Sequence, residues 1–310
     1  MQRFSNILLV HEGRPRGRKA CDRAIDLASR NKARLKLLEV AEPLPSSGVK
    51  YQAPDGELDL QTLVEREIVT KLAQKAEELS VDGLVVESKA LFGDAFLEIM
   101  REVHHGQHDL VLLTAEGDGG IKEHLFGSLS RHLLRKCPCP VWVVRPARRK
   151  KSIRVLAAVN PTETHPSARN LDRTVLEMAS SLARMYGGQL DIVHVWQQAP
   201  RSGRVHRNVV AKWNAELLLA AEQRVTEMLD HFDFSDLGPR IHLPGGPTGM
   251  RIVEVAEERK VDVLVMGTLS RSGLQGMFMG NTAESVLQHI DASVLAVKPE
   301  GFESPVKFDS

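Results

Sequence analysis

The sequence has few cysteines and no long apolar run. Cys21, Cys137 and Cys139 are the only cysteines among 310 residues, which is too few for a disulfide framework and fits a reducing compartment. No apolar stretch approaches the roughly 18 residues of a membrane span. The N-terminal MQRFSNILLV, followed by HEGRPRGRK, lacks the order of a secretory signal. We therefore expect a cytoplasmic protein with no membrane partner.

An excess of charge of either sign is also missing. The chain has 41 Lys and Arg residues against 40 Asp and Glu residues, a formal net charge of +1, so no global field attracts nucleic acid and DNA is not expected as a partner. Hydrophobic residues at 42% and charged residues at 26% exclude intrinsic disorder for most of the chain. Aromatic residues make up only 5%, so aliphatic side chains must form most of the core. At about 150 residues per domain, the length predicts two domains.

The chain contains two copies of one unit. In the first half the recurring segments are HDLVLLT (108–114), LFGSLSRHLLRKC (125–137) and PVWVVRP (140–146), and in the second half they are VDVLVMGT (261–268), FMGNTAESVLQHI (278–290) and SVLAVKP (293–299). Asp109 and Asp262 are 153 positions apart, whereas NILLVHEG and IRVLAAVNP, which begin the copies, correspond at an offset of 148. The second copy therefore has a small insertion. The repeat predicts domains at residues 1–146 and 153–310, joined by a solvated basic linker at 147–152.

Short β-branched runs alternate with stretches of helical periodicity in both copies, which is typical of a parallel sheet covered on both faces. Strands are predicted near 5–10, 34–40, 83–88, 109–114 and 141–145, and near 153–159, 190–196, 239–243, 262–267 and 293–298. Helices are predicted near 17–31, 60–79, 94–104 and 128–136, and near 168–186, 210–231, 248–259 and 281–290. Segments 42–59 and 197–209 are interpreted as loops. The fold class is therefore α/β, with two tandem doubly wound five-stranded parallel sheets and a ligand crevice at the carboxyl ends of each set of strands.

The loop after the fourth strand of the second copy has the composition of a phosphate-binding loop. It begins at Gly267 and ends near Gly280, where a helix starts. Such a loop presents backbone N–H groups and the positive end of a helix dipole to an anion. Ser270, Asn281 and Thr282 carry side chains that bond phosphate or ribose oxygens. The alternative is a capping box, because a Glu follows Asn281 by three residues.

At this loop the chain resembles the universal stress proteins, in their tandem two-domain form, over nearly all of both halves. Nucleotide-binding members of that family carry Gly, two residues, Gly, nine residues, and then Gly followed by Ser or Thr. The second copy has Gly267, Ser270, Gly280 and Asn281 at these positions, and the first copy has Thr114, Gly117, Gly127 and Ser128. The resemblance implies a stress-response regulator that binds an adenine nucleotide, most simply ATP, with Mg²⁺ entering only together with the nucleotide.

The second domain is predicted to hold the better site. In binding members an Asp at the end of the first strand contacts the nucleoside, and Glu12 and Asn160 occupy these positions here. Met266 is assigned either to the apolar side of a base pocket or to the core. The predicted nucleotide-binding residues are Ala158, Val159, Asn160, Met266, Gly267, Leu269, Ser270, Gly280, Asn281 and Thr282. The weaker site of the first domain consists of Glu12, Gly117, Gly127 and Ser128.

Other clusters were weighed for different chemistry. His104, His105 and His108 beside Asp109 invite a metal interpretation, but no Cys or second carboxylate completes a tetrahedral set, so no metal site is predicted. Cys137-Pro-Cys139-Pro is not a C-x-x-C motif, and its prolines favour a structural turn. The glycine-rich segment 245–249 either lines a base pocket or makes a tight turn.

Known catalytic motifs are missing from the sequence. There is no G-x-S-x-G elbow, and Ser128 is interpreted as a helix N-cap. The Walker pattern is also missing, because apolar residues stand at Met277 and Phe278 where its Lys would be expected. No catalytic residue is therefore assigned, and the sequence favours a binding role, with at most weak ATP hydrolysis.

The fifth strands suggest how the two domains interact. PVWVV and SVLAV are apolar and would each end a sheet, so exposing both would invite aggregation. The family resemblance implies that these strands pair, which makes an intramolecular pseudo-dimer. A homodimer of chains and an unidentified protein partner remain open. The alternatives to nucleotide binding are a nucleotide-free interaction protein or a binder of an apolar ligand, with slow ATP hydrolysis as a third hypothesis.

Overall fold

The computed structural model describes residues 3–11, 18–43, 50–53, 56–81, 83–115, 126–145, 152–162, 166–199, 207–268 and 279–307. The first half contains β1 (Asn6–His11), α1 (Arg18–Asn31), β2 (Arg34–Ala41), β3 (Lys50–Ala53), β4 (Gly56–Asp59), α2 (Leu60–Leu79), β5 (Val86–Phe92), α3 (Ala95–Gly106), β6 (Leu110–Thr114), α4 (Ser128–Lys136) and β7 (Val141–Val144). The second half contains β8 (Arg154–Ala158), α5 (Pro166–Met185), β9 (Gln189–Val193), α6 (Arg207–Leu229), β10 (Arg240–His242), α7 (Thr248–Glu258), β11 (Val263–Gly267), α8 (Asn281–His289) and β12 (Ser293–Val297).

Ten strands form one continuous sheet in the order β10-β9-β8-β11-β12-β7-β6-β1-β2-β5. Within each half of this sheet all pairs are parallel, and the first strand lies in the middle: β1 between β2 and β6, and β8 between β9 and β11. The halves join where β12 pairs antiparallel with β7, and Leu295 lies opposite Trp142. Two doubly wound five-stranded sheets were predicted from the sequence, and the α/β fold class is confirmed.

The two faces of the sheet have separate apolar cores, and each core is continuous through both halves. One core joins α1 and α2 to α5, and the other joins α3 and α4 to α7 and α8. Alternation along the strands assigns the side chains to the two faces: Ile7 and Leu9 belong to the first core, and Leu8 and Val10 to the second. Because neither core ends at the boundary between the halves, the halves stabilise each other by burial of shared apolar surface.

The repeated aspartates have the same structural role in each half. Asp109 Oδ1 accepts the backbone N–H of Asn6 at 3.0 Å, and Asp262 Oδ2 accepts that of Arg154 at 2.9 Å. Each aspartate thereby fixes the start of the first strand to the start of the fourth. The insertion in the second copy lies partly in α5, which has 20 residues against 14 in α1.

Some elements differ from the prediction. Strand β5 begins at Val86 and not near residue 83, because a turn intervenes: Leu84 N–H donates to the Val81 carbonyl and Gly83 has φ +82°. The Ser80 hydroxyl then accepts the N–H of Val86. Segment 42–59, predicted to be a loop, contains the β3–β4 hairpin, and α6 begins within segment 197–209.

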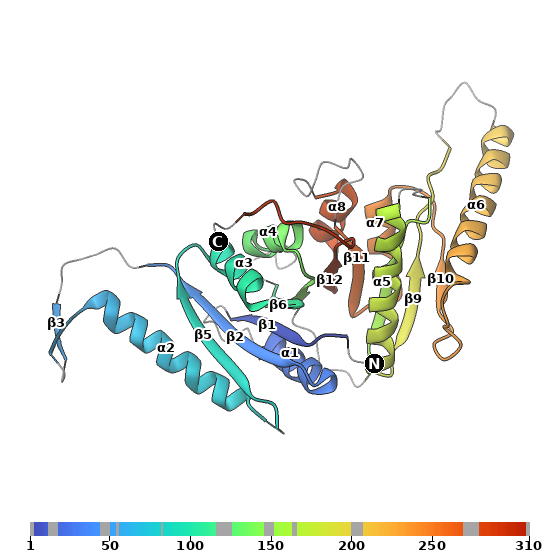
Figure 1. The fold of residues 1–310 in the computed structure, drawn as a ribbon. Helices are drawn as coiled ribbons and strands as arrows, with labels where there is room; N and C mark the ends of the chain where they lie inside the picture. Colours follow the sequence, from blue (N-terminus) through green and yellow to red (C-terminus); the bar gives the residue numbers. More distant parts are fainter. Residues whose placement is uncertain are drawn as a thin grey trace.

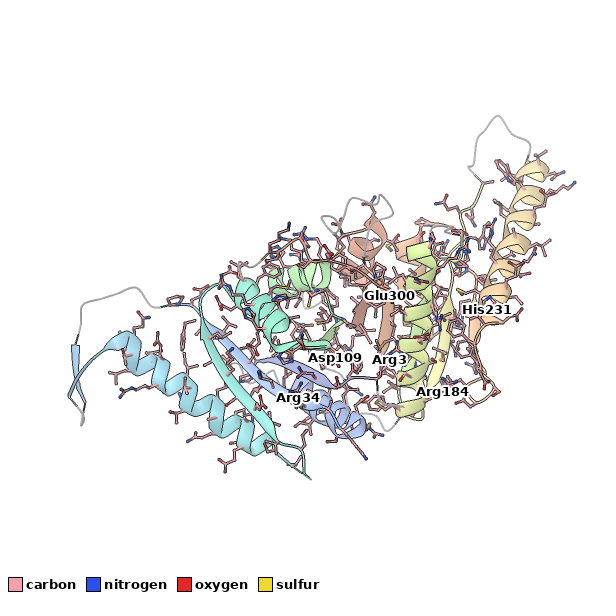
Figure 2. The ribbon with its side chains drawn as sticks, in the orientation of Figure 1. Arg3, Arg34, Asp109, Arg184, His231 and Glu300 are labelled. Carbon is pink, nitrogen blue, oxygen red and sulfur yellow. The ribbon has the colours of Figure 1, made fainter. Side chains whose placement is uncertain are left out.

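The long helices α2 and α6 mark the two ends of the molecule, and the β3–β4 hairpin extends beyond α2 (Figure 1). The N-terminal segment crosses to the second half, where Arg3 lies beside α5 and pairs with Glu177 at 3.2 Å (Figure 2). The guanidinium of Arg30, on α1, donates to the Met185 carbonyl at 2.9 Å. Within the described part of the chain, no helix combines the length and the apolar character needed to cross a membrane.

Candidate functional site

The candidate site lies where the direction of winding changes in the second half. Strand β8 continues to β9 on one side, whereas its other neighbour, β11, continues to β12. Ala158 lies opposite Met266 in the β8–β11 register, so the predicted residues at the two strand ends are adjacent. Ligands of doubly wound sheets bind in the crevice outside the carboxyl ends of such a strand pair.

Helix α8 begins at this edge. Its N-cap is Gly280, at φ −68° and ψ 144°, and no described side chain caps it by a hydrogen bond. The Gly280 N–H donates to the Thr268 carbonyl at 3.2 Å, which ties the helix start to the end of β11. Asn281 and Thr282 occupy the first turn, whose N–H groups have no partner within a helix and whose dipole favours an anion.

This geometry corrects one interpretation of the sequence. Asn281 is the first residue of the helix and not its cap, so the capping box with Glu284 is wrong. The first backbone bond of the helix runs from the Glu284 N–H to the Gly280 carbonyl at 3.0 Å. Gly280 fits the N-cap position because glycine is accepted there without a side-chain oxygen.

Gly267 has a packing role at the end of β11. A Cβ atom on Gly267 would lie 2.5 Å from Cδ2 of Leu171, which projects from α5. Any larger residue therefore forces Leu171 to move. The sequence suggested that Gly267 lets a ligand approach the backbone. In the structure it is the Leu171 side chain of α5 that approaches the backbone at Gly267.

Asn160 lies at the end of β8 within a small polar network. Its backbone N–H donates to Asp172 Oδ1 at 3.0 Å, and its side-chain oxygen accepts the Thr162 hydroxyl at 2.6 Å. Asp172 is buried and comes from α5. The sequence analysis did not select Asp172, because a single Asp in a helical stretch resembles any solvent-facing position.

The neighbouring strand-end residues are mostly buried. Val159 is 6% exposed, and its carbonyl bonds Nδ1 of His194 at 3.2 Å. Met266 is 3% exposed and belongs to the core beneath α7 and α8, together with Met279. Ala158 is half-buried. Contact between these residues and a nucleotide stays a prediction, while Leu269 and Ser270 lie outside the described residues.

The glycine-rich turn before α7 is explained by packing. A Cβ atom on Gly245 would lie 2.6 Å from the Trp196 ring, whose Nε1 donates to the Leu243 carbonyl at 3.0 Å. A Cβ atom on Gly249 would lie 2.4 Å from the Ser285 hydroxyl of α8. These glycines let Trp196 and α8 approach the turn closely.

The corresponding edge of the first half repeats the uncapped helix. Gly127 is the N-cap of α4, at φ −63° and ψ 170°, and no described side chain caps it by a hydrogen bond. Ser128 is the first helical residue, so its assignment as the N-cap is wrong. Glu12 and Gly117, the other candidates of this site, lie outside the described residues.

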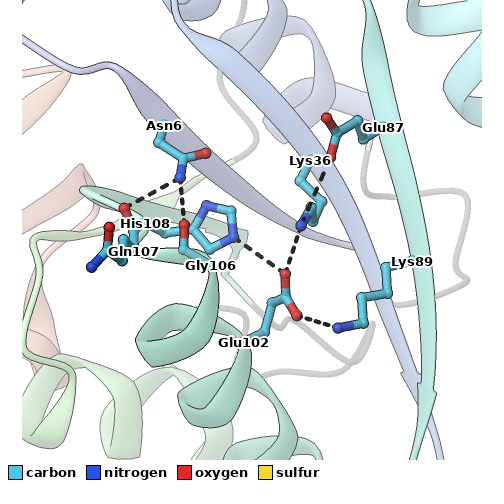
Figure 3. Close-up of polar contacts among 8 residues, drawn as sticks. All are labelled: Asn6, Lys36, Glu87, Lys89, Glu102, Gly106, Gln107 and His108. Carbon is cyan, nitrogen blue, oxygen red and sulfur yellow. Dashed lines mark hydrogen bonds and ion pairs between the residues drawn. The ribbon is translucent and has the colours of Figure 1, made fainter.

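His108 belongs to a buried ion cluster on α3, β2 and β5 (Figure 3). Glu102, 3% exposed, accepts Lys36 at 2.9 Å, Lys89 at 2.6 Å and His108 Nε2 at 3.4 Å. Burial acts to raise the pKa of Glu102, but the hydrogen bonds from Lys89 and Lys36 outweigh it and lower the pKa to about 2. Burial lowers the pKa of His108. Among the described residues, no His, Cys, Asp or Glu side chains are grouped in threes or more as a metal would require.

The second half has an ion cluster at the corresponding place, in which a buried carboxylate stands at the strand position of a lysine. Asp191 on β9, 1% exposed, pairs with His242 Nε2 at 2.7 Å and with Arg259 at 3.1 Å. In the two registers, Asp191 corresponds to Lys36 and His242 to Lys89. These clusters therefore tie α3 to β2 and β5, and the C-terminal end of α7 to β9.

The chain was compared with known proteins. The model of the Universal stress protein family matches residues 3–145 and again residues 161–298. Universal stress protein E of Photorhabdus laumondii is 27% identical over 99% of this chain and 99% of its own. A crystal structure of a functionally unknown Pseudomonas aeruginosa protein matches at a TM-score of 0.73 with 24% identity, over 97% of this chain and 95% of its own. A universal stress protein structure from Archaeoglobus fulgidus matches at 0.65 with 20% identity, over 94% and 98%.

Proposed function

Because the chain belongs to the universal stress protein family, in its tandem form, we propose that its second domain binds an adenine nucleotide, most simply ATP, and that the protein acts as a cytoplasmic stress-response regulator. Mg²⁺ would enter with the nucleotide. The first domain is the weaker site and serves mainly as a scaffold. The proposal assigns no catalytic residue.

The observation that carries this proposal is the start of α8. Two features coincide there: the first-turn N–H groups of a helix whose N-cap is Gly280, and the adjacent carboxyl ends of β8 and β11. The bond from Gly280 N–H to Thr268 holds the helix start beside the strand end. A phosphate chain at this point would receive backbone N–H donors and the positive end of the α8 dipole.

The base and ribose are assigned to the end of β8. The Thr162 hydroxyl donates a hydrogen bond to the side-chain oxygen of Asn160. This bond orients the amide, and its Nδ2 group is the donor that we assign to the ligand. Asp172 fixes the backbone of the same residue. Asn160 replaces a charged group of the family pattern, so we expect it to recognise the ligand by hydrogen bonds alone.

Titration calorimetry of the full chain with ATP tests the proposal. The Gly280→Asp variant places a capping carboxylate on the first turn of α8, which satisfies its N–H groups and repels phosphate, so we expect at least about tenfold weaker binding. The backbone angles at Gly280 accept Asp without strain. Gly127→Asp makes the same change at α4 and is the matched control, with near-unchanged affinity expected. No heat at millimolar ATP, or equal effects of the two variants, would refute the proposal.

One observation favours the alternative, an interaction protein without nucleotide. The protruding helix α6 carries Val209, Trp213 and Leu219, which are 55%, 48% and 64% exposed, and apolar groups gathered on one exposed element suit a protein partner. In that case Trp213→Glu abolishes function and Gly280→Asp does not. A bound apolar ligand would be released and identified when the purified protein is denatured. Steady ADP release would instead support slow ATP hydrolysis.

The partners are also part of the proposal. We propose that the tandem chain is an intramolecular pseudo-dimer in which one half takes the place that a second chain would occupy. A homodimer of whole chains and a separate protein partner remain compatible with it. Light scattering of the purified chain, with and without ATP, distinguishes a single chain from a dimer.

A further inference from the structure

Two thiols meet at the junction of the halves. Cys137 is the C-cap of α4 and is fully buried, whereas Cys139 is half-buried, one residue before Pro140. The chain bends at Pro138 and Cys139, which brings the two Sγ atoms to 3.5 Å. A disulfide needs an approach to about 2 Å between sulfurs, so closing it requires the two sulfurs to move together and strains this bend.

A buried ammonium group from the other half lies beside these thiols. Lys298, at the end of β12, is 7% exposed and donates to the Leu134 carbonyl of α4 and to the Thr268 hydroxyl. Thr268 in turn donates to the same carbonyl at 2.8 Å. Burial lowers the pKa of Lys298 to about 8, while both thiols act in the opposite direction. The hydrogen bond from Cys139 lowers the pKa of Cys137 and raises that of Cys139.

We propose that Cys137 and Cys139 form a reversible disulfide when the protein meets hydrogen peroxide. The half-buried Cys139 Sγ attacks one peroxide oxygen, the O–O bond breaks, and a sulfenic acid forms while water leaves with the thiol proton. Cys137 Sγ then attacks Cys139 Sγ, the S–O bond breaks, and hydroxide leaves with the second thiol proton as water. Two thiols are oxidised, and one peroxide is reduced to two waters.

Access decides which thiol reacts first. Cys139 is half-buried and meets a small oxidant, although its raised pKa makes this first step slow, whereas Cys137 is fully shielded and resolves the sulfenic acid. The charge of Lys298 favours the thiolate form of Cys137 that this second step requires. A disulfide closed across a single proline is strained, and strained disulfides are the readily reduced ones. The bond is therefore expected to reverse with ordinary thiol reductants.

The position of the pair gives the oxidation a route to the second half. Cys137 ends the helix whose Leu134 carbonyl bonds Lys298 and Thr268. Thr268 is the residue whose carbonyl holds the Gly280 N–H at the start of α8. A shift at the end of α4 therefore reaches the α8 start through two hydrogen bonds. This last step rests on the proposed nucleotide site, whereas the disulfide itself does not.

The test exposes the full chain to hydrogen peroxide, blocks free thiols with iodoacetamide and digests it with trypsin. One peptide, which begins after Lys136, contains both Cys137 and Cys139 but not Cys21. We expect it to appear unalkylated and lighter by two hydrogens, and to return to the dialkylated form after dithiothreitol. Cys21→Ser is the control and should behave like the natural chain, while Cys139→Ser should abolish the change.

Two results would overturn the proposal: a peptide that stays fully alkylatable after peroxide, or a sulfenic acid on Cys139 that persists without closing. Lys298→Met tests the role of the ammonium group and should slow disulfide closure by about 3- to 10-fold. Lys298→Arg keeps the charge and should close at nearly the natural rate. Equal closure rates in all three chains would exclude a role for Lys298. An ATP affinity that does not differ between reduced and oxidised chains would remove only the link to α8.

Discussion

Glu102 lies in an environment very different from that of an ordinary surface carboxylate. It is 3% exposed and neutralises Lys36 and Lys89, which are 23% and 45% exposed. Glu102→Gln removes the buried carboxylate that pairs with both ammonium groups in a partly desolvated place, so we predict a loss of about 2 kcal/mol in the free energy of unfolding. Urea denaturation at neutral pH measures it.

A matched control lies on the same cluster. Glu87 also pairs with Lys36, at 3.8 Å, but its side chain is 63% exposed (Figure 3). Solvent screens that pair, so Glu87→Gln should change the free energy of unfolding by less than about 0.5 kcal/mol. If Glu87→Gln and Glu102→Gln lowered the free energy of unfolding equally, the burial of Glu102 would not be what makes its ion pairs strong.

The same cluster predicts how stability depends on pH. The pKa of Glu102 falls from 4.5 to about 2 on folding, so its contribution is fully present above 4.5 and is lost as the pH falls toward 2. The pKa of His108 is also lowered from 6.5, so the unfolded chain takes up a proton first and stability declines once the pH falls below 6.5.

The contribution of Glu102 can be tested by experiment. We predict that the stability difference between the natural chain and Glu102→Gln shrinks below pH 4.5, because the unfolded state then protonates Glu102. Urea denaturation in steps of pH gives this difference. A difference that stays the same down to pH 3 or so would contradict the lowered pKa of Glu102.

At the scale of elements, the contact between β11 and α5 depends on one missing side chain. Gly267→Ala places a Cβ atom 2.5 Å from Leu171 Cδ2, and overpacking of this kind costs about 1–3 kcal/mol. Leu171→Ala removes the clashing atoms, so the double variant should lose less stability than the sum of the two single losses. Thermal unfolding of the four chains measures this coupling. Strict additivity would show that the strand end relaxes away from Leu171.

The sequence could predict the elements that depend on local pattern and on the repeat. The apolar strands, the Asp109 and Asp262 equivalence and the adjacent ends of β8 and β11 follow from periodicity and from the doubly wound topology. The roles of Gly267 and Asp172 could not be predicted, because each depends on a contact with a different element. A contact between residues of two different elements cannot be inferred from the spacing of residues within either element.

The N-caps show the same limit at closer range. Gly127 with Ser128, and Gly280 with Asn281, each offered two candidate caps in consecutive positions. Side-chain propensity favours Ser and Asn at the cap, but the structure places glycine there in both halves. The family motif pointed to these glycines, whereas the propensity argument selected the following residue. If the first-turn N–H groups bind a ligand, a glycine N-cap leaves them available, whereas Ser or Asn at the cap would bond to them.

At the scale of the whole molecule, each half contributes a basic side chain that binds the other half across their junction. Lys298, after β12, donates to the C-terminal turn of α4, and Arg145, after β7, pairs at 3.4 Å with Asp291 just beyond α8. A cation near a helix C-terminus is stabilised by the helix dipole. The backbone of Arg145 also donates to the Ser293 hydroxyl at 3.0 Å. These contacts add to the β7–β12 pairing and to the two shared cores.

This shared junction predicts that the covalent link between the halves is dispensable once the chain has folded. A protease site inserted at residues 147–151 and cut in the folded protein should leave the halves as one species on size-exclusion chromatography, because Trp142 and Leu295 stay buried against each other. The cut protein should also melt in one transition. The uncut variant is the control for the inserted site. Separation of the halves at micromolar concentration would mean that the linker, and not the continuous sheet, holds the molecule together.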